Sequence, residues 1–85
     1  MMTKKILLVE DDITLGETLK ERLEKDYFVD WAQTEKVALQ KLDQQFFDLV
    51  ILDVNLPDGS GFNIAEKKLL NPKVNIVFLT AKSDD

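Results

Sequence analysis

Two short apolar runs that end in acidic residues constrain this chain more than any other feature. Residues 6–9 (ILLV) run directly into the acidic triplet at 10–12 (EDD), and residues 49–52 (LVIL) run into Asp53. Continuous apolar runs of this length are typical of strands that are buried on both faces of a parallel sheet. Ligands of open α/β sheets bind just beyond the carboxyl ends of such strands. The sequence therefore predicts an acidic site at one edge of a parallel sheet.

The rest of the chain alternates helical and extended patterns. We expect strands at 6–9, 27–32, 47–53 and 74–79, and helices at 13–25, from Thr34 onward, and from Phe62 to the break at Asn71 and Pro72. Asp12 or Thr14 is the expected N-cap of the first helix, and Thr34 that of the second. The order β-α-β-α-β-α-β predicts an α/β fold with a mostly parallel sheet. At 85 residues, the chain fits one small domain.

The composition excludes several classes of function. A net charge of −5 argues against direct nucleic-acid binding by this segment, because such binding needs a basic face. Without cysteine the chain has no disulfide framework, and without histidine it cannot itself carry a phosphohistidine. The apolar runs are too short to cross a bilayer, and no signal-peptide pattern precedes Lys4 and Lys5. We therefore expect a cytoplasmic protein without a membrane partner.

The acidic residues predict a magnesium site. Glu10 and Asp11 lie beside Asp53 if the two buried strands are neighbours in the sheet, as successive strands often are. Carboxylates at such short separations repel one another, and a hard divalent cation such as Mg²⁺ compensates their charge. The alternatives are a solvated acidic run and an aspartate that merely ends its strand. Asp12 is better explained as a helix cap than as a ligand.

Two further residues are candidates for the same site. Asn55, two residues after Asp53, could offer its backbone carbonyl to the cation. Thr80 follows the apolar run at 74–79 and could direct its hydroxyl toward a phosphate held on Asp53. The alternative for Thr80 is an ordinary β-branched strand residue. Carboxylates, a cation and a hydroxyl at one sheet edge together indicate phosphoryl chemistry.

Three segments in this order resemble the receiver domain of two-component response regulators: 7–12 (LLVEDD), 48–61 (DLVILDVNLPDGSG) and 78–81 (FLTA). The resemblance runs along residues 1–85 but covers only about the first two-thirds of a typical receiver. It implies a flavodoxin-like open parallel sheet with helices on both faces and the strand order 2-1-3-4-5. The sheet would be incomplete here, because the last helix, strand and helix of a receiver are missing.

The resemblance also implies a role for each candidate residue. Asp53 would accept a phosphoryl group from a phosphohistidine on a sensor histidine kinase. Asp11, Asp53 and the backbone carbonyl of Asn55 would bind Mg²⁺ directly, and Glu10 would act through water. Thr80 would hydrogen-bond the aspartyl phosphate and act as a switch. Residues 15–17 (LGE) and the loop after Asp53 are most similar to receivers of winged-helix transcription factors, which implies an output in transcriptional regulation.

The chain departs from the family because residues 1–85 do not include the lysine that, in a complete receiver, follows the fifth strand and pairs with the phosphate. Lys82 follows Thr80 too closely to be that residue. We therefore expect weak phosphorylation, and either self-association through the surface that the missing C-terminal elements leave uncovered or a piece of a longer chain. One alternative is a truncated, non-catalytic receiver fragment that acts only by dimerisation or kinase docking. A phosphatase with Asp53 as nucleophile would need an aspartate where Asn55 stands, so a turnover enzyme is not expected.

Overall fold

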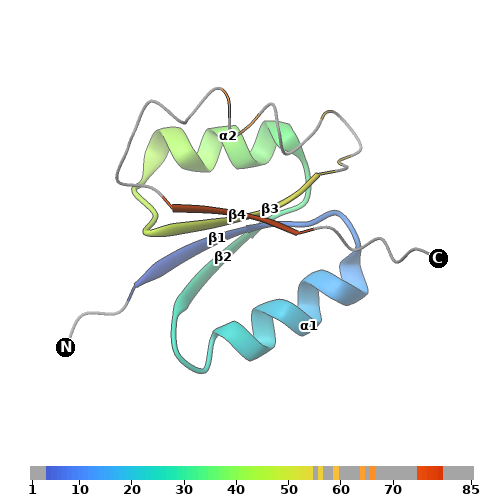
Figure 1. The fold of residues 1–85 in the computed structure, drawn as a ribbon, viewed down its shortest axis with the longest axis vertical. Helices are drawn as coiled ribbons and strands as arrows, with labels where there is room; N and C mark the ends of the chain where they lie inside the picture. The colour runs from blue at the N-terminus through green and yellow to red at the C-terminus, as the bar shows by residue number, and fades with distance from the viewer. Residues whose placement is uncertain are drawn as a thin grey trace.

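The strands of this chain form one parallel sheet. The structure, a computed structural model, describes residues 4–54, 56, 59, 64, 66 and 75–79. Its strands are β1 (Lys5–Val9), β2 (Phe28–Ala32), β3 (Leu49–Asp53) and β4 (Asn75–Leu79), and its complete helices within the described residues are α1 (Ile13–Leu23) and α2 (Glu35–Gln44). The strand order is β2-β1-β3-β4, and all neighbours are parallel (Figure 1). The predicted flavodoxin-like α/β architecture is confirmed.

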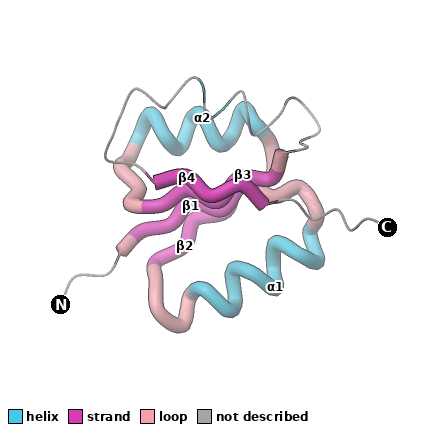
Figure 2. The backbone as a smooth tube through the Cα atoms, viewed as in Figure 1, coloured by secondary structure: helices cyan, strands magenta, loops and turns pink. Residues whose placement is uncertain are grey.

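The helices α1 and α2 lie on opposite faces of the sheet (Figure 2). Of the third helix expected from Phe62 onward, Ile64 and Glu66 are helical, and its other residues lie outside the described part of the chain. The strand β1 runs through the middle of the sheet, between β2 and β3. Its two edges pair with strands and its two faces are covered by the helices (Figure 2), so it is buried as its continuous apolar run predicts.

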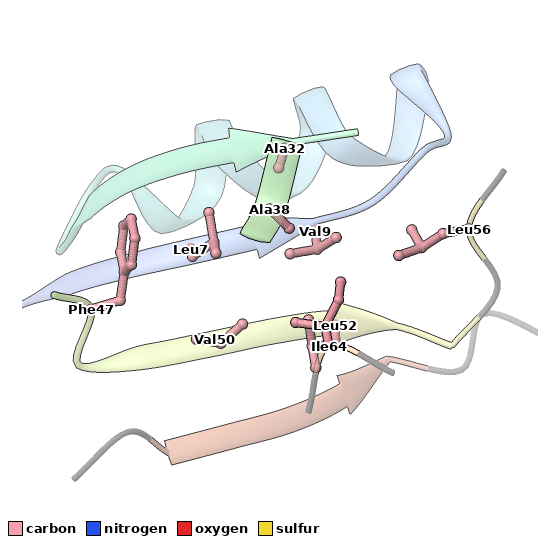
Figure 3. Close-up of a cluster of buried hydrophobic side chains, with 9 residues drawn as sticks. All are labelled: Leu7, Val9, Ala32, Ala38, Phe47, Val50, Leu52, Leu56 and Ile64. Atoms are coloured by element: carbon pink, nitrogen blue, oxygen red, sulfur yellow. The ribbon is translucent and has the colours of Figure 1, made fainter. Parts of the chain in front are cut away.

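Two apolar clusters pack against the two faces of the sheet. The cluster on the α2 side is built around fully buried side chains and is drawn in Figure 3; its members are Leu7, Val9, Ala32, Ala38, Phe47, Val50, Leu52, Leu56 and Ile64. The cluster on the other face joins Ile6, Leu8 and Val29 to Leu19 and Leu23 of α1. Because successive side chains of a strand point to opposite faces, β1 contributes alternate residues to both clusters.

Both helices begin at the residues that local capping chemistry favours. Asp12 Oδ1 accepts a hydrogen bond from the Leu15 backbone N–H over 3.0 Å, and Thr34 Oγ1 accepts one from the Val37 N–H over 3.1 Å. Of the two candidates for the first cap, Asp12 is therefore correct, and Thr14 lies inside the helix. A side-chain oxygen at this position satisfies one of the free N–H groups of the first turn.

Some of the predicted boundaries are wrong by one or two residues. The first helix ends at Leu23, before residue 25, because the chain turns there to bring the Phe28 N–H within 2.9 Å of the Lys4 carbonyl. The third strand begins at Leu49, although Phe47 is fully buried. Phe47 packs into the core from the turn before the strand, and an apolar pattern alone does not separate these two situations.

Candidate metal and phosphoacceptor site

The register of the sheet brings the two acidic segments together. The strand β1 pairs with β3 so that Val9 lies opposite Leu52. The next residues of the two strands are therefore Glu10 and Asp53, at the same carboxyl edge. The strand order places β1 beside β3, and the register then places Glu10 and Asp53 at the same level of the sheet.

Three predicted site residues converge at this edge. One carboxylate oxygen each from Glu10, Asp11 and Asp53 lies within 4.8 Å of the other two. Glu10 is 2% exposed and Asp53 is 7% exposed, whereas Asp11 faces solvent. Asn55 and Thr80, the other two candidates, lie outside the described residues. The cluster thus has two buried carboxylates and one accessible carboxylate.

The link between β1 and α1 orients Glu10. The Asp12 backbone N–H donates a hydrogen bond to Glu10 Oε2 over 3.0 Å. The Glu10 backbone N–H donates to the Ala32 carbonyl over 3.0 Å, which continues the pairing of β1 with β2 by one residue. Since the Asp12 side chain is used to cap α1, it is not part of the acidic cluster.

The surroundings of Glu10 disfavour its negative charge. Burial is the largest cause that raises the pKa of Glu10 from 4.5 to about 7. The neighbouring carboxylates of Asp53 and Asp11 raise this pKa further, while the hydrogen bond from the Asp12 N–H opposes them. The Oε1 atom of Glu10 is buried and has no hydrogen-bond partner among the described residues. A carboxylate held in this way favours either a proton or a cation.

The donor set fits a hard divalent cation. Mg²⁺ binds oxygen ligands and is typically held by one or two carboxylates, with water and phosphate oxygens completing its coordination. Asp11 and Asp53 can supply two carboxylate ligands, and the nearby Glu10 adds a third negative charge. Such an ion would also compensate the repulsion between the buried carboxylates.

One contact of the site was not anticipated from the sequence. The Trp31 indole donates a hydrogen bond from Nε1 to the backbone carbonyl of Glu10 over 2.8 Å. From the sequence, Trp31 is expected only as part of the strand at 27–32. The available signal was a tryptophan near the carboxyl end of a strand that adjoins β1, since a buried indole N–H usually finds an acceptor.

Comparison with curated proteins finds relatives that are named transcriptional regulatory proteins. One relative is the transcriptional regulatory protein CreB of Escherichia coli (strain K12), with 37% identity over 87 aligned positions. This match covers 100% of the present chain and 38% of CreB. Another relative is the transcriptional regulatory protein YrkP of Bacillus subtilis (strain 168), with 41% identity over 83 aligned positions. This match covers 96% of the present chain and 36% of YrkP. The chain thus spans little more than a third of the length of these relatives. In its described part, no helix has the length and apolar character that a membrane span requires.

The similar solved structures and the matching family model both point to one family. The non-phosphorylated receiver domain of HemR from Leptospira biflexa has a TM-score of 0.87 at 49% identity, over 98% of this chain and 68% of that one. The response regulator TrrA from Thermotoga maritima, in complex with Mg²⁺-BeF, has a TM-score of 0.87 at 38% identity, over 95% of this chain and 72% of that one. The family model of the response regulator receiver domain matches residues 6–85. The chain therefore belongs to the response regulator receiver domain family.

Proposed function

We propose that this chain is a phosphoacceptor receiver module of a two-component phosphorelay, with Asp53 as the acceptor. The observation that best supports this is the convergence of Glu10, Asp11 and Asp53 oxygens within 4.8 Å at the carboxyl edge of the sheet. Asp53 is the last residue of β3 and follows the fully buried Leu52. The carboxylate of Asp53 is therefore held on a rigid support. Family membership and the Mg²⁺-BeF complex of TrrA support the same function.

The proposed chemistry is transfer of a phosphoryl group to an Asp53 carboxylate oxygen. The proposed donor is a phosphohistidine of a sensor histidine kinase, as family membership suggests. Residues 1–85 contain no histidine that could serve as this donor. An electron pair of the Asp53 oxygen forms the new O–P bond while the P–N bond breaks. The two electrons of the broken P–N bond stay on the imidazole nitrogen. Such transfer depends mainly on positioning and on neutralisation of the phosphoryl charge, which bound Mg²⁺ supplies.

The remaining site residues prepare this step. Asp11 and Asp53 would be direct ligands of Mg²⁺, together with the backbone carbonyl of Asn55, and Glu10 would act through water. Thr80 would donate a hydrogen bond to the phosphoryl oxygens on Asp53. The buried, partner-poor Oε1 of Glu10 supports its part in this arrangement, because a hydrated cation would supply the donors that it lacks.

In this proposal residues 1–85 are the amino-terminal two-thirds of a receiver, and the domain relays its phosphoryl group rather than turning over a substrate. The names of the relatives support an output in transcriptional regulation. Self-association remains a prediction. The apolar surface of β4, where Val77 is 50% exposed and Phe78 is 40% exposed, supports it. Light scattering on the purified chain would measure it, and a monomer at all concentrations would contradict it.

The test is the intact mass of the folded chain after incubation with acetyl phosphate and Mg²⁺. We expect a single phosphoryl adduct on the wild type and none on Asp53→Asn. Asp26→Asn is the matched control, because Asp26 is exposed in the turn after α1 and makes the same change of charge. An equal adduct on Asp53→Asn would show that the acceptor is another residue. A folded wild type without an adduct would favour the non-catalytic receiver fragment.

A further inference from the structure

The strand β2 places an indole against the backbone of the acidic site. Trp31 is the single tryptophan of the chain and pairs with Leu8, just before the last register pair of β1 and β2, which is Val9 with Ala32. The Glu10 carbonyl lies beyond that last pair. The Trp31 Nε1–H donates to it over 2.8 Å, so a side chain holds the backbone where the strand ladder stops.

The helix α1 is adapted to this indole. Trp31 packs against the buried cluster between the sheet and α1, as Leu19 and Leu23 of α1 also do. A Cβ atom added at Gly16 would overlap Cζ2 and Cε2 of the Trp31 ring. Gly16 is buried in the middle of α1, where glycine is less favourable than alanine by about 1 kcal/mol. The close approach of the ring explains why a glycine stands there.

Together these contacts anchor Glu10 at three points. Its N–H donates to the Ala32 carbonyl, its carbonyl accepts from Trp31, and its Oε2 accepts from the Asp12 N–H. The repulsion between the Glu10 and Asp53 carboxylates would be relieved if the peptide between residues 10 and 11 rotated away from β3. The indole hydrogen bond opposes this rotation, because its acceptor is the carbonyl of that same peptide.

We propose that Trp31 is a positioning residue that fixes the peptide between Glu10 and Asp11 and thereby raises the affinity of the acidic site for Mg²⁺. This inference rests on the proposed magnesium site. The indole does not touch the ion. It holds the carboxylates in the arrangement that the ion requires, so that less ordering is left to be done on binding. Without this hydrogen bond the peptide of the metal-free chain can rotate away, and its reordering on binding is expected to weaken the affinity by about 3- to 10-fold.

The test is the Mg²⁺ dissociation constant of the full chain, measured by isothermal titration calorimetry at pH 8. Trp31→Phe keeps an aromatic ring against α1 and removes the N–H donor. Leu19→Ala is the matched control, because Leu19 packs in the same cluster and is not part of the acidic site. We expect Trp31→Phe to bind Mg²⁺ about 3- to 10-fold more weakly than the wild type, and Leu19→Ala to bind like the wild type.

A second replacement keeps the test decisive if Trp31→Phe does not fold. Exchange of the Trp31 indole for a benzothiophene preserves the shape of the ring system and removes only the N–H group, and it should weaken Mg²⁺ binding to the same extent. Wild-type affinity in a folded Trp31 variant would overturn this inference and leave the proposed function standing. Equal weakening in Leu19→Ala would also overturn it, because the effect would then reflect loss of packing. No Mg²⁺ binding by the folded wild type would overturn the proposed function as well.

Discussion

The substitution Glu10→Gln is expected to stabilise the metal-free domain, and to do so more strongly as the pH rises. Glu10 is 2% exposed, and its pKa is raised from 4.5 to about 7, chiefly by burial. The folded state therefore binds a proton more tightly than the unfolded state. Stability from this group is fully present below pH 4.5 and is lost as the pH rises through about 7.

The magnitude follows from the difference between the two pKa values. One pKa unit corresponds to about 1.4 kcal/mol, so ionised Glu10 destabilises the folded state by about 3 kcal/mol at pH 8.5. At pH 5.5, where Glu10 is protonated in the folded state and mostly ionised in the unfolded state, the same linkage gives about 1 kcal/mol. Glutamine keeps the size of the side chain and never ionises. The gain in stability from Glu10→Gln should therefore grow by about 2 kcal/mol over this pH range.

Urea denaturation in EDTA, followed by circular dichroism at pH 5.5, 7 and 8.5, measures this difference in the free energy of unfolding. Glu21→Gln is the control, because Glu21 is exposed on α1 and loses the same charge. Its effect should be small and nearly independent of pH. A Glu10→Gln variant whose advantage over the wild type stays constant with pH would show that the ionisation of Glu10 is not linked to folding.

Three further predictions concern the ion, the helix contact and the core. Mg²⁺ affinity, measured by calorimetry, should rise as the pH increases through about 7, because Glu10 must lose its proton; a flat profile between pH 6 and 8 would contradict this. Gly16→Ala should lower the melting temperature despite the better helix propensity of alanine, since overlap with Trp31 costs about 1–3 kcal/mol; an unchanged or higher value would show that the ring moves aside freely. Phe47→Ala should cost about 3–5 kcal/mol in urea denaturation, whereas Phe46→Ala, at a 49% exposed position, should cost much less; equal effects would contradict the assignment of the core.

Local chemistry explains which features were predictable. The residues of β1 could be identified because a short, unbroken apolar run is typical of a strand that is buried on both faces. The helix starts at Asp12 and Thr34 could be predicted because a cap depends only on the next three residues. The end of α1 and the start of β3 were misjudged, because Lys25 and Phe47 fit the local pattern equally well inside or outside an element.

The order of the strands and helices, and the carboxylates that follow β1 and β3, can be read from the chain alone. These features depend on neighbours in the chain, and they sufficed to predict an acidic site. Packing in three dimensions brings oxygens of Glu10, Asp11 and Asp53 within 4.8 Å of one another and raises the pKa of Glu10 to about 7 by burial. It also places the Trp31 indole against the carbonyl of Glu10. Distance, burial and a partner from another strand are properties of elements packed together from separate parts of the chain. The register of β2, β1 and β3 sets all of them at once.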